Sequence, residues 1–185
     1  DLGGTAIKAG VVSRAGEMLS RASRATEPET GPEGVADRIA ITAREALQAC
    51  GLTLGDVDGV GVGTPGICDA ARGVVVSSGN LGWREVPLAA LLRHRLGVLV
   101  RLENDANCAA WGEQWCGAAR GVDDVILFTL GTGVGGALIL GGRVYRGAAG
   151  WAGELGHIRV APDGPRCACG LTGCLEAVAS AAAMA

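Results

Sequence analysis

The sequence predicts an α/β fold with a mixed or parallel sheet. Three observations support this: short apolar runs alternate with segments of helical periodicity, glycine turns separate the runs, and a polar cluster directly follows one of them. Strands that alternate with helices favour a sheet covered by helices. The chain has 185 residues, 49% of them hydrophobic, which is enough for one large domain or one and a half.

The first elements read as strand, helix, strand. Residues 6–12 are apolar and follow a Gly-Gly-Thr turn, which predicts a strand. Residues 34–50 place apolar side chains at helical spacing, which predicts an amphipathic helix. Residues 57–62 read as a buried strand, and the turn at 63–66, Gly-Thr-Pro-Gly, should return the chain toward a site.

The next elements place a carboxylate at the end of a strand. We expect a helix over residues 87–95, a strand over 98–102 and a third helix that begins within 103–107, Glu-Asn-Asp-Ala-Asn. Ligands of α/β sheets bind beyond the carboxyl ends of the strands. Asp105 is therefore expected to lie at such a site.

Residues 125–142 carry no charge, which raises the question of a membrane span. Six of these eighteen residues are glycine, and the apolar runs 125–130 and 134–140 flank Gly131-Thr132-Gly133. A spanning helix of about 20 residues would seldom hold so much glycine at its middle, so we predict two strands and a turn. With residues 143–146 they would open a second sheet. We thus expect an N-terminal lobe over 1–122 and the start of a C-terminal lobe over 123–185.

Both ends of the sequence suggest a fragment. Asp1 enters a glycine turn at once, where a preceding strand is expected, and the chain stops within an alanine-rich helical run, 177–185, that has no cap.

Charge and cysteine content restrict the partners and the compartment. The net charge is −3 with mixed signs and without a basic stripe, so nucleic acid is not an expected partner. The cysteines number seven, and four of them are scattered without a pairing pattern. Reduced thiols in a cytoplasmic protein fit this better than a disulfide framework.

A Cys3His motif near the C-terminus is the most informative feature of the sequence. Its candidate metal ligands are His157, Cys167, Cys169 and Cys174. Three thiols and an imidazole suffice for a tetrahedral structural Zn²⁺ site, and Gly170 and Gly173 allow sharp turns between them. The alternatives are ordinary small core residues or a disulfide pair. Glu154 and Glu176 flank the motif, and a loop held by metal could fix both carboxylates around a polyhydroxylated ligand.

Two glycine turns are candidate phosphate sites. The first, Asp1-x-Gly3-Gly4-Thr5-x2-Lys8, combines backbone N–H groups with a carboxylate that could hold Mg²⁺ through water. The second spans residues 130–136. One such turn is also a common hairpin device, but two facing each other across a cleft would clamp a polyphosphate. The spacing excludes a P-loop, and the strand–helix context of a Rossmann turn is missing.

Asp105 has two possible roles. It could cap the third helix, which would contribute about 1 kcal/mol. Alternatively it could act as a general base for phosphoryl transfer, a reaction that needs one carboxylate for the proton and otherwise needs positioning and charge neutralisation.

These motifs, in this order, resemble the ROK family of sugar kinases and related repressors over essentially all 185 residues. The likeness is most specific at residues 103–107 and 154–176. It implies the actin-like ATPase fold, also called the hexokinase or ribonuclease H-like fold, with two lobes that close on nucleotide and sugar. The second lobe would be incomplete in this chain.

The resemblance also implies roles for individual residues. Asp105 matches the catalytic base that deprotonates the sugar hydroxyl, normally O6 of a hexose. The nucleotide phosphates of ATP would meet Asp1, Gly3, Gly4, Thr5, Lys8, Thr132, Gly133 and Gly135. The sugar would meet Gly66, Asn80, Asn104, Asp105, Glu154, His157 and Glu176. One ring nitrogen of His157 would bind zinc while the other faces the sugar.

The function that the resemblance implies is ATP-dependent phosphorylation of a hexose, with glucose favoured because residues 103–113 look like the glucokinase branch. Kinases of N-acetylglucosamine, N-acetylmannosamine and fructose share these motifs. The alternative is a sugar-responsive repressor with a DNA-binding module before Asp1. Homodimers are common among such proteins. Family kinases continue beyond this point with the part that covers adenine and ribose, so we expect a fragment of this length to be inactive or poorly folded.

Overall fold

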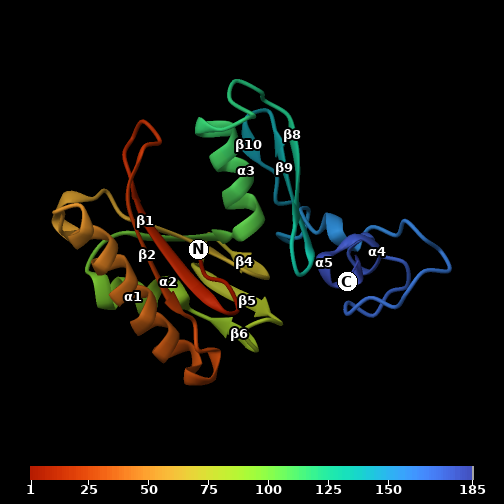
Figure 1. Cartoon of the computed structure of the whole chain (residues 1–185), viewed down its shortest axis with the longest axis horizontal. Helices are drawn as coiled ribbons and strands as arrows, with labels where there is room; N and C mark the ends of the chain where they lie inside the picture. Colours follow the sequence, from red (N-terminus) through yellow and green to blue (C-terminus); the bar gives the residue numbers. More distant parts are fainter. Residues whose placement is uncertain (185) are drawn as a thin grey trace. The chain divides into compact units, whose positions relative to one another are not determined.

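The computed structural model describes residues 1–184, which form two compact units. Unit 1 is Asp1–Asp105, and unit 2 begins at Ala106. Figure 1 shows the elements of both units in chain order. The lobe boundary expected between residues 122 and 123 differs from this division by helix α3 and the turn after it. The helix belongs with unit 2 because Ala106 and Ala110 pack against Ala137 and Ile139.

Unit 1 begins with a hairpin and a long helix. Strand β1 (Ala6–Val12) pairs antiparallel with β2 (Met18–Ala25), and α1 (Gly31–Ala49) packs against both after the short 3-10 helix η1 (Pro28–Thr30). A proline in its first turn starts α1, and Gly51, at φ 74°, follows its end. The apolar face of α1 is buried, as the periodicity of the sequence predicted.

A parallel pair of strands carries the site of unit 1. After η2 (Leu54–Asp56), β3 (Val60–Thr64) pairs in parallel with β7 (Val100–Asn104), with Thr64 opposite Asn104. Helix α2 (Leu88–Leu96) provides the crossover and ends at Gly97, at φ 70°. The carboxyl ends of β3 and β7 therefore lie at one edge, as predicted.

Three short strands between β3 and α2 form a separate antiparallel sheet: β4 (Ile67–Asp69), β5 (Val74–Ser78) and β6 (Trp83–Val86). The residue pattern does not predict these three strands. They have three to five residues each, too few for a clear alternation of polar and apolar side chains.

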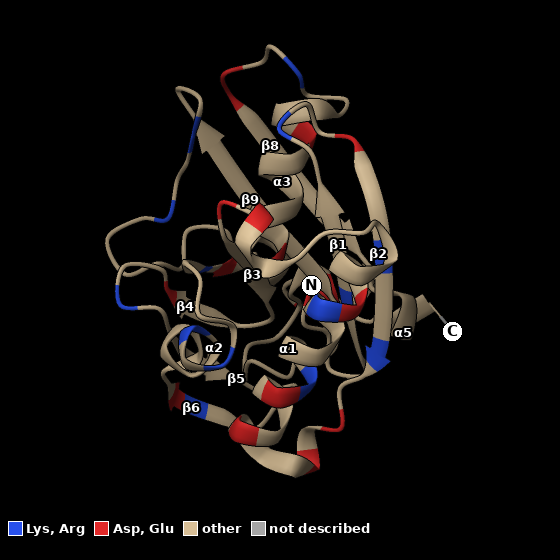
Figure 2. Ribbon diagram, turned by 90° about the vertical axis from the view of Figure 1, so that its left-hand side faces the viewer, with Lys and Arg blue, Asp and Glu red and all other residues tan. Residues whose placement is uncertain are grey.

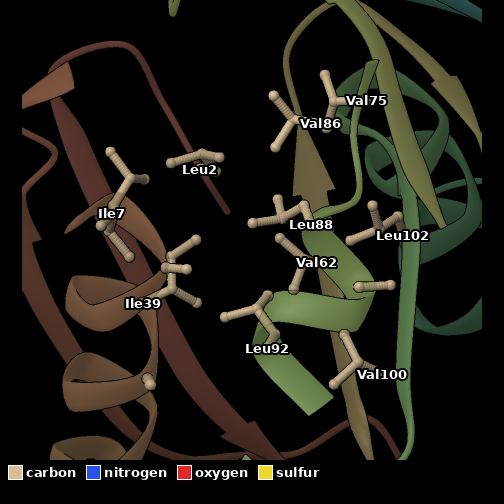
Figure 3. Packing of buried hydrophobic residues seen from close by; sticks show 14 of the residues in the cluster. Leu2, Ile7, Ile39, Val62, Val75, Val86, Leu88, Leu92, Val100 and Leu102 are labelled. Carbon is tan, nitrogen blue, oxygen red and sulfur yellow. The ribbon is translucent and has the colours of Figure 1, made fainter. Parts of the chain in front are cut away.

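The main core lies in unit 1. Leu88 and Leu92 of α2 and Val35 of α1 are fully buried, and they pack with residues of β1, β3, β5 and β7 in one cluster. Figure 3 shows Leu2 and Ile7 approaching this cluster from the β1 side and Val100 and Leu102 from the β7 side.

A groove of about 490 Å³ separates β1 from β3. Its walls include residues 7–14 on the β1 side and 57–62 on the β3 side, and α1 contributes apolar side chains. Among the described residues β1 pairs with β2 and β3 with β7, so the edges of β1 and β3 that face the groove carry no neighbouring strand. At one end the Asp1–Leu2 segment bridges the walls, because the N–H of Leu2 donates to Gly63 O at 2.8 Å and Leu2 pairs with Ile7. We call this feature the strand groove.

Unit 2 consists of a helix, a meander and a long loop. Helix α3 (Asp105–Cys116) starts at the last residue of unit 1 and leads to β8 (Val125–Leu130), β9 (Val134–Leu140) and β10 (Arg143–Val144), a sheet of order β10-β9-β8. The 3-10 helix η3 (Leu155–His157) opens the loop, and α4 (Leu175–Ala179) and α5 (Ala181–Met184) follow it. The predicted single run 177–185 is thus interrupted at Ser180, and its last residue lies outside the described part.

The two predicted strands at 125–130 and 134–140 are confirmed by β8 and β9. Within residues 1–184, no helix is long and apolar enough to cross a membrane. Figure 2 shows acidic and basic residues interspersed along the ribbon, with both signs on α1.

Candidate functional site

The first glycine turn closes a tight hairpin at the start of unit 1. The N–H of Gly3 donates to Ala6 O at 2.9 Å, while Asp1 and Lys8 exchange two backbone hydrogen bonds of 2.9 Å each. The side chain of Thr26, which is fully buried, donates from Oγ1 to Gly3 O at 2.7 Å. Thr26 could not be found from a motif, because it follows the end of β2 and lies 23 positions from Gly3.

The tip of this turn offers hydrogen-bond donors. In the described chain, the backbone N–H groups of Gly4 and Thr5 donate to no protein acceptor. Adjacent N–H groups of this kind can bind an anionic oxygen. Asn80 lies beside the turn, since a Cβ placed on Gly4 would be 3.5 Å from the Cβ of Asn80. The structure therefore brings a predicted sugar residue next to a predicted phosphate turn.

Asp105 lies where the parallel pair of strands ends. It is exposed and is the first residue of α3. Beside it, Asn104 donates from Nδ2 to Gly66 O at 3.2 Å, which joins the ends of β7 and β3. Gly66 has φ 90°, and a Cβ there would collide with Ser77 O, so only glycine fits this approach. Asn104 thus links Gly66 to the strand end that Asp105 follows.

The second glycine turn is the tip of the β8–β9 hairpin in unit 2. The N–H of Gly131 donates to Gly133 O at 3.0 Å, and Val134 begins β9. Within the described chain, the N–H groups of Thr132 and Gly133 donate to no protein acceptor. This turn therefore repeats the donor arrangement of the first one. Both turns are hairpins, which confirms that they are not Rossmann turns.

The Cys3His residues gather at one point. The ligand atoms of His157, Cys167, Cys169 and Cys174 all lie within 4.8 Å of one another. The sulfurs of Cys169 and Cys174 are 3.7 Å apart, and Cys167 Sγ is 3.6 Å from His157 Nδ1. Tetrahedral zinc with Zn–S bonds of about 2.3 Å separates two sulfurs by about 3.8 Å, so the donor set fits this ion.

The loop that carries these residues is shaped by its own backbone. Val160 N–H donates to Gly173 O at 2.8 Å, and Cys167 N–H donates to Leu171 O at 2.7 Å. Gly173 has φ 75° and a Cβ there would collide with Ala161 O, which explains the need for glycine. The cysteines in this loop are free thiols, so the disulfide alternative finds no support.

The thiols of the cluster differ in acidity. Burial, followed by the two neighbouring thiols Cys169 and Cys167, raises the pKa of Cys174 to about 12. A hydrogen bond from the Leu171 backbone lowers the pKa of Cys169. Burial disfavours the thiolate of Cys174 in the absence of a cation, and a dication at the centre of the cluster would reverse this.

The two flanking carboxylates have different neighbours. Glu154 Oε2 is 3.8 Å from His157 Nε2, on the opposite side of the ring from the cysteines. Glu176 Oε2 accepts a hydrogen bond from Val134 N–H at 3.0 Å, and its Oε1 lies 3.9 Å from Cys167 Sγ. The contact with Val134 was not foreseen, because 42 residues separate the two positions.

Comparisons with known proteins show which family the whole chain is similar to. A model of the ROK family matches residues 1–185. A curated glucokinase of Thermotoga maritima is 45% identical over the whole chain, which covers 57% of that protein. The crystal structure of a ROK family glucokinase from Streptomyces griseus in complex with glucose and AMPPNP has a TM-score of 0.87 and 46% identity, and covers 99% of this chain and 56% of that one.

Regulators are similar as well. A ROK family transcriptional regulator, a homolog of the E. coli MLC protein, has a TM-score of 0.84 and 29% identity over 99% of this chain and 46% of that chain. The chain thus spans about half the length of the relatives it matches, and the match to ROK glucokinase structures establishes the actin-like fold with an incomplete second lobe.

Proposed function

The chain belongs to the ROK family, and from this premise we propose that the protein is an ATP-dependent hexose kinase that phosphorylates glucose at O6. The observation that carries the proposal is Asp105 at the carboxyl ends of a parallel strand pair, next to Asn104 and Gly66. Glucokinase relatives at 40–45% identity support the choice of reaction and sugar.

Asp105 would act as the general base. Its carboxylate takes the proton of the O6 hydroxyl as that oxygen bonds to the γ-phosphorus, and the bond to ADP breaks. Gly66, Asn80 and Asn104 of unit 1 would hold the sugar hydroxyls, together with Glu154, His157 and Glu176 of unit 2. Asp105 is exposed, as a residue that meets a substrate would be.

The glycine turns would hold the nucleotide phosphates. Each turn presents two backbone N–H groups without a described protein acceptor, at Gly4 and Thr5 and at Thr132 and Gly133. Backbone donors suit the anionic oxygens of a phosphate, and Lys8 and Gly135 flank the turns. Asp1 would hold Mg²⁺, whose charge offsets that of the phosphates.

The Cys3His cluster would hold a structural Zn²⁺. The ligands would be His157, Cys167, Cys169 and Cys174. The ion would have a structural role, because its four bonds would hold the loop in one conformation. The proposal rests on the fit between the observed sulfur separation and tetrahedral zinc. With the second nitrogen of His157 near Glu154, the imidazole would be oriented from both sides.

Three further statements are proposals of the same kind. We place the protein in the cytoplasm, because its cysteines are free thiols. We expect a homodimer, on the family resemblance alone. A sugar-responsive repressor is the alternative function, because a ROK transcriptional regulator is also structurally similar over nearly the whole chain.

The test is a coupled ADP-release assay with Mg²⁺, Zn²⁺ and ATP on the complete protein. Glucose, N-acetylglucosamine, N-acetylmannosamine and fructose are compared. We expect glucose-dependent turnover in the wild type, a loss of about 10²–10⁴-fold in Asp105→Asn, and normal turnover in Asp163→Asn, an exposed aspartate on the loop of unit 2.

Each other outcome has a distinct meaning. Turnover on another of the four sugars would keep Asp105 as the base and change the substrate. Sugar binding without turnover on any sugar would reject the kinase and favour the repressor. Undiminished turnover in Asp105→Asn would reject Asp105 as the base.

A further inference from the structure

The Cys3His cluster and the second glycine turn are connected through one side chain. Glu176 lies in the first turn of α4, two residues after Cys174. Its Oε2 accepts the hydrogen bond from Val134 N–H at 3.0 Å, and its Oε1 lies 3.9 Å from Cys167 Sγ. A single half-buried carboxylate thus contacts a metal-ligand candidate on one side and the glycine turn on the other.

The contact with the turn is specific in shape. A Cβ built on Gly133 would meet Glu176 Oε2, so the carboxylate packs closely against the backbone of this glycine. A hydrogen bond from an amide to an ionised carboxylate is stronger than one to a neutral acceptor. Glu176 therefore fixes the residue at which the turn becomes β9.

The same segment holds the other side of the turn. The backbone N–H of Ala181 donates to Gly131 O at 2.9 Å. Gly131 is held from α5 and Val134 from α4, and the residues between them, Thr132 and Gly133, keep their N–H groups available. A turn fixed at both ends presents its donors with less loss of entropy on binding an anion.

We propose that Glu176 is a positioning residue that couples the Cys3His cluster to the Gly131–Gly133 turn. With the cluster closed around Zn²⁺, Cys174 anchors the start of α4, and Glu176 then holds Val134. The metal site thereby sets the order of a nucleotide-phosphate turn. This deepens the proposed function, and it gives Glu176 a role separate from the sugar contact expected of it.

Amide hydrogen exchange tests the coupling without ATP or sugar. The intact protein is compared as zinc-loaded and chelator-treated samples of wild type, Glu176→Ala and Glu176→Gln. Asp163→Ala, which removes an exposed carboxylate from the same loop, is the matched control. Zinc content is measured for every sample, and amides of β1 in unit 1 report on general unfolding.

We expect the Val134 amide to exchange about ten-fold faster in zinc-loaded Glu176→Ala, the effect of one charge-assisted hydrogen bond, with zinc content unchanged. Glu176→Gln, whose neutral amide oxygen still accepts but without the charge, should give a Val134 exchange rate between those of the wild type and Glu176→Ala. Chelation should accelerate Val134 exchange in the wild type and add little in Glu176→Ala, because the link is already broken.

Two results would overturn the proposal. One is unchanged Val134 exchange in Glu176→Ala. The other is an equal effect of chelation in wild type and Glu176→Ala, which would mean that the metal acts on the turn by another route. Because the measurement requires no turnover, its result is independent of whether the kinase assay succeeds.

Discussion

At the scale of single residues, the first glycine turn depends on a side chain outside its motif. Thr26 is fully buried and donates to Gly3 O from Oγ1, while its own N–H donates to Thr5 O at 3.0 Å. The hydroxyl therefore satisfies a carbonyl that the turn itself leaves without a backbone partner in the hairpin. A buried carbonyl that loses its only donor is costly.

Thr26→Val keeps the shape of the side chain and removes the donor. We expect the free energy of unfolding to fall by about 1–3 kcal/mol, because the half-buried Gly3 O loses its hydrogen bond with the fully buried Thr26. Thr26→Ser retains the hydroxyl, so its free energy of unfolding should decrease by less. Urea denaturation of both variants measures the difference, and equal stabilities would show that the hydroxyl is not needed.

Gly66 is a second residue whose identity is fixed by its surroundings. Gly66→Ala places a Cβ against Ser77 O at a φ of 90°, so we expect a loss of about 1–3 kcal/mol from backbone strain alone. Gly79→Ala is the matched control, since a Cβ there meets no atom within 4 Å. Thermal unfolding compares the two, and a Gly66→Ala protein as stable as the control would contradict the assigned geometry.

At the scale of elements, the sequence predicted helices and strands well where an apolar repeat extended over many residues or an apolar run was continuous. Helix α1 has 19 residues with an apolar face, and the predicted helix at 34–50 overlaps most of it. Strand β1 matches its predicted bounds. Strand β2, Met18–Ala25, was missed because it alternates small and charged residues with half-buried positions and so has little apolar signal.

The candidate site shows the same division. The Cys3His cluster could be predicted because its four residues lie within 18 positions and share one chemistry. The contacts of Thr26 and Glu176 could not, because each joins residues 23 or more positions apart through one hydrogen bond. Contacts between distant residues depend on strand register and on the packing of loops. Neither can be read from the spacing of residues in the sequence.

The Cys3His loop is expected to depend on its metal. Cys174→Ser removes a buried ligand, so the zinc content should fall well below the expected one ion per chain, and the Tm of unit 2 should drop by about 10 °C. Cys116→Ser changes an exposed cysteine of α3 and should alter neither quantity. Elemental analysis and calorimetry measure both. Full zinc content in Cys174→Ser would exclude this residue as a ligand.

At the scale of the whole molecule, the chain consists of two units with separate cores. The large cluster around Leu88 and Leu92 stabilises unit 1, while the smaller cluster of unit 2 is built on Ala106, Ala110 and Ile139. The candidate groups of the site are divided between the units: Asp105, Asn104 and Gly66 belong to unit 1, and the Cys3His residues belong to unit 2. The chain covers 57% of the Thermotoga maritima glucokinase and 56% of the Streptomyces griseus glucokinase chain.

The strand groove is expected to promote self-association of the isolated chain in solution. Each of its two walls exposes a row of peptide N–H and C=O groups along β1 or β3, over an apolar floor that includes Val11, Ile39 and Val62. Such a surface templates any extended polypeptide that reaches it. We expect these 185 residues to self-associate as protein concentration rises, as seen by light scattering, and an added apolar six-residue peptide to suppress this while a proline-containing version does not. Aggregation at high protein concentration, rather than thermal unfolding, would then limit experiments on the isolated chain.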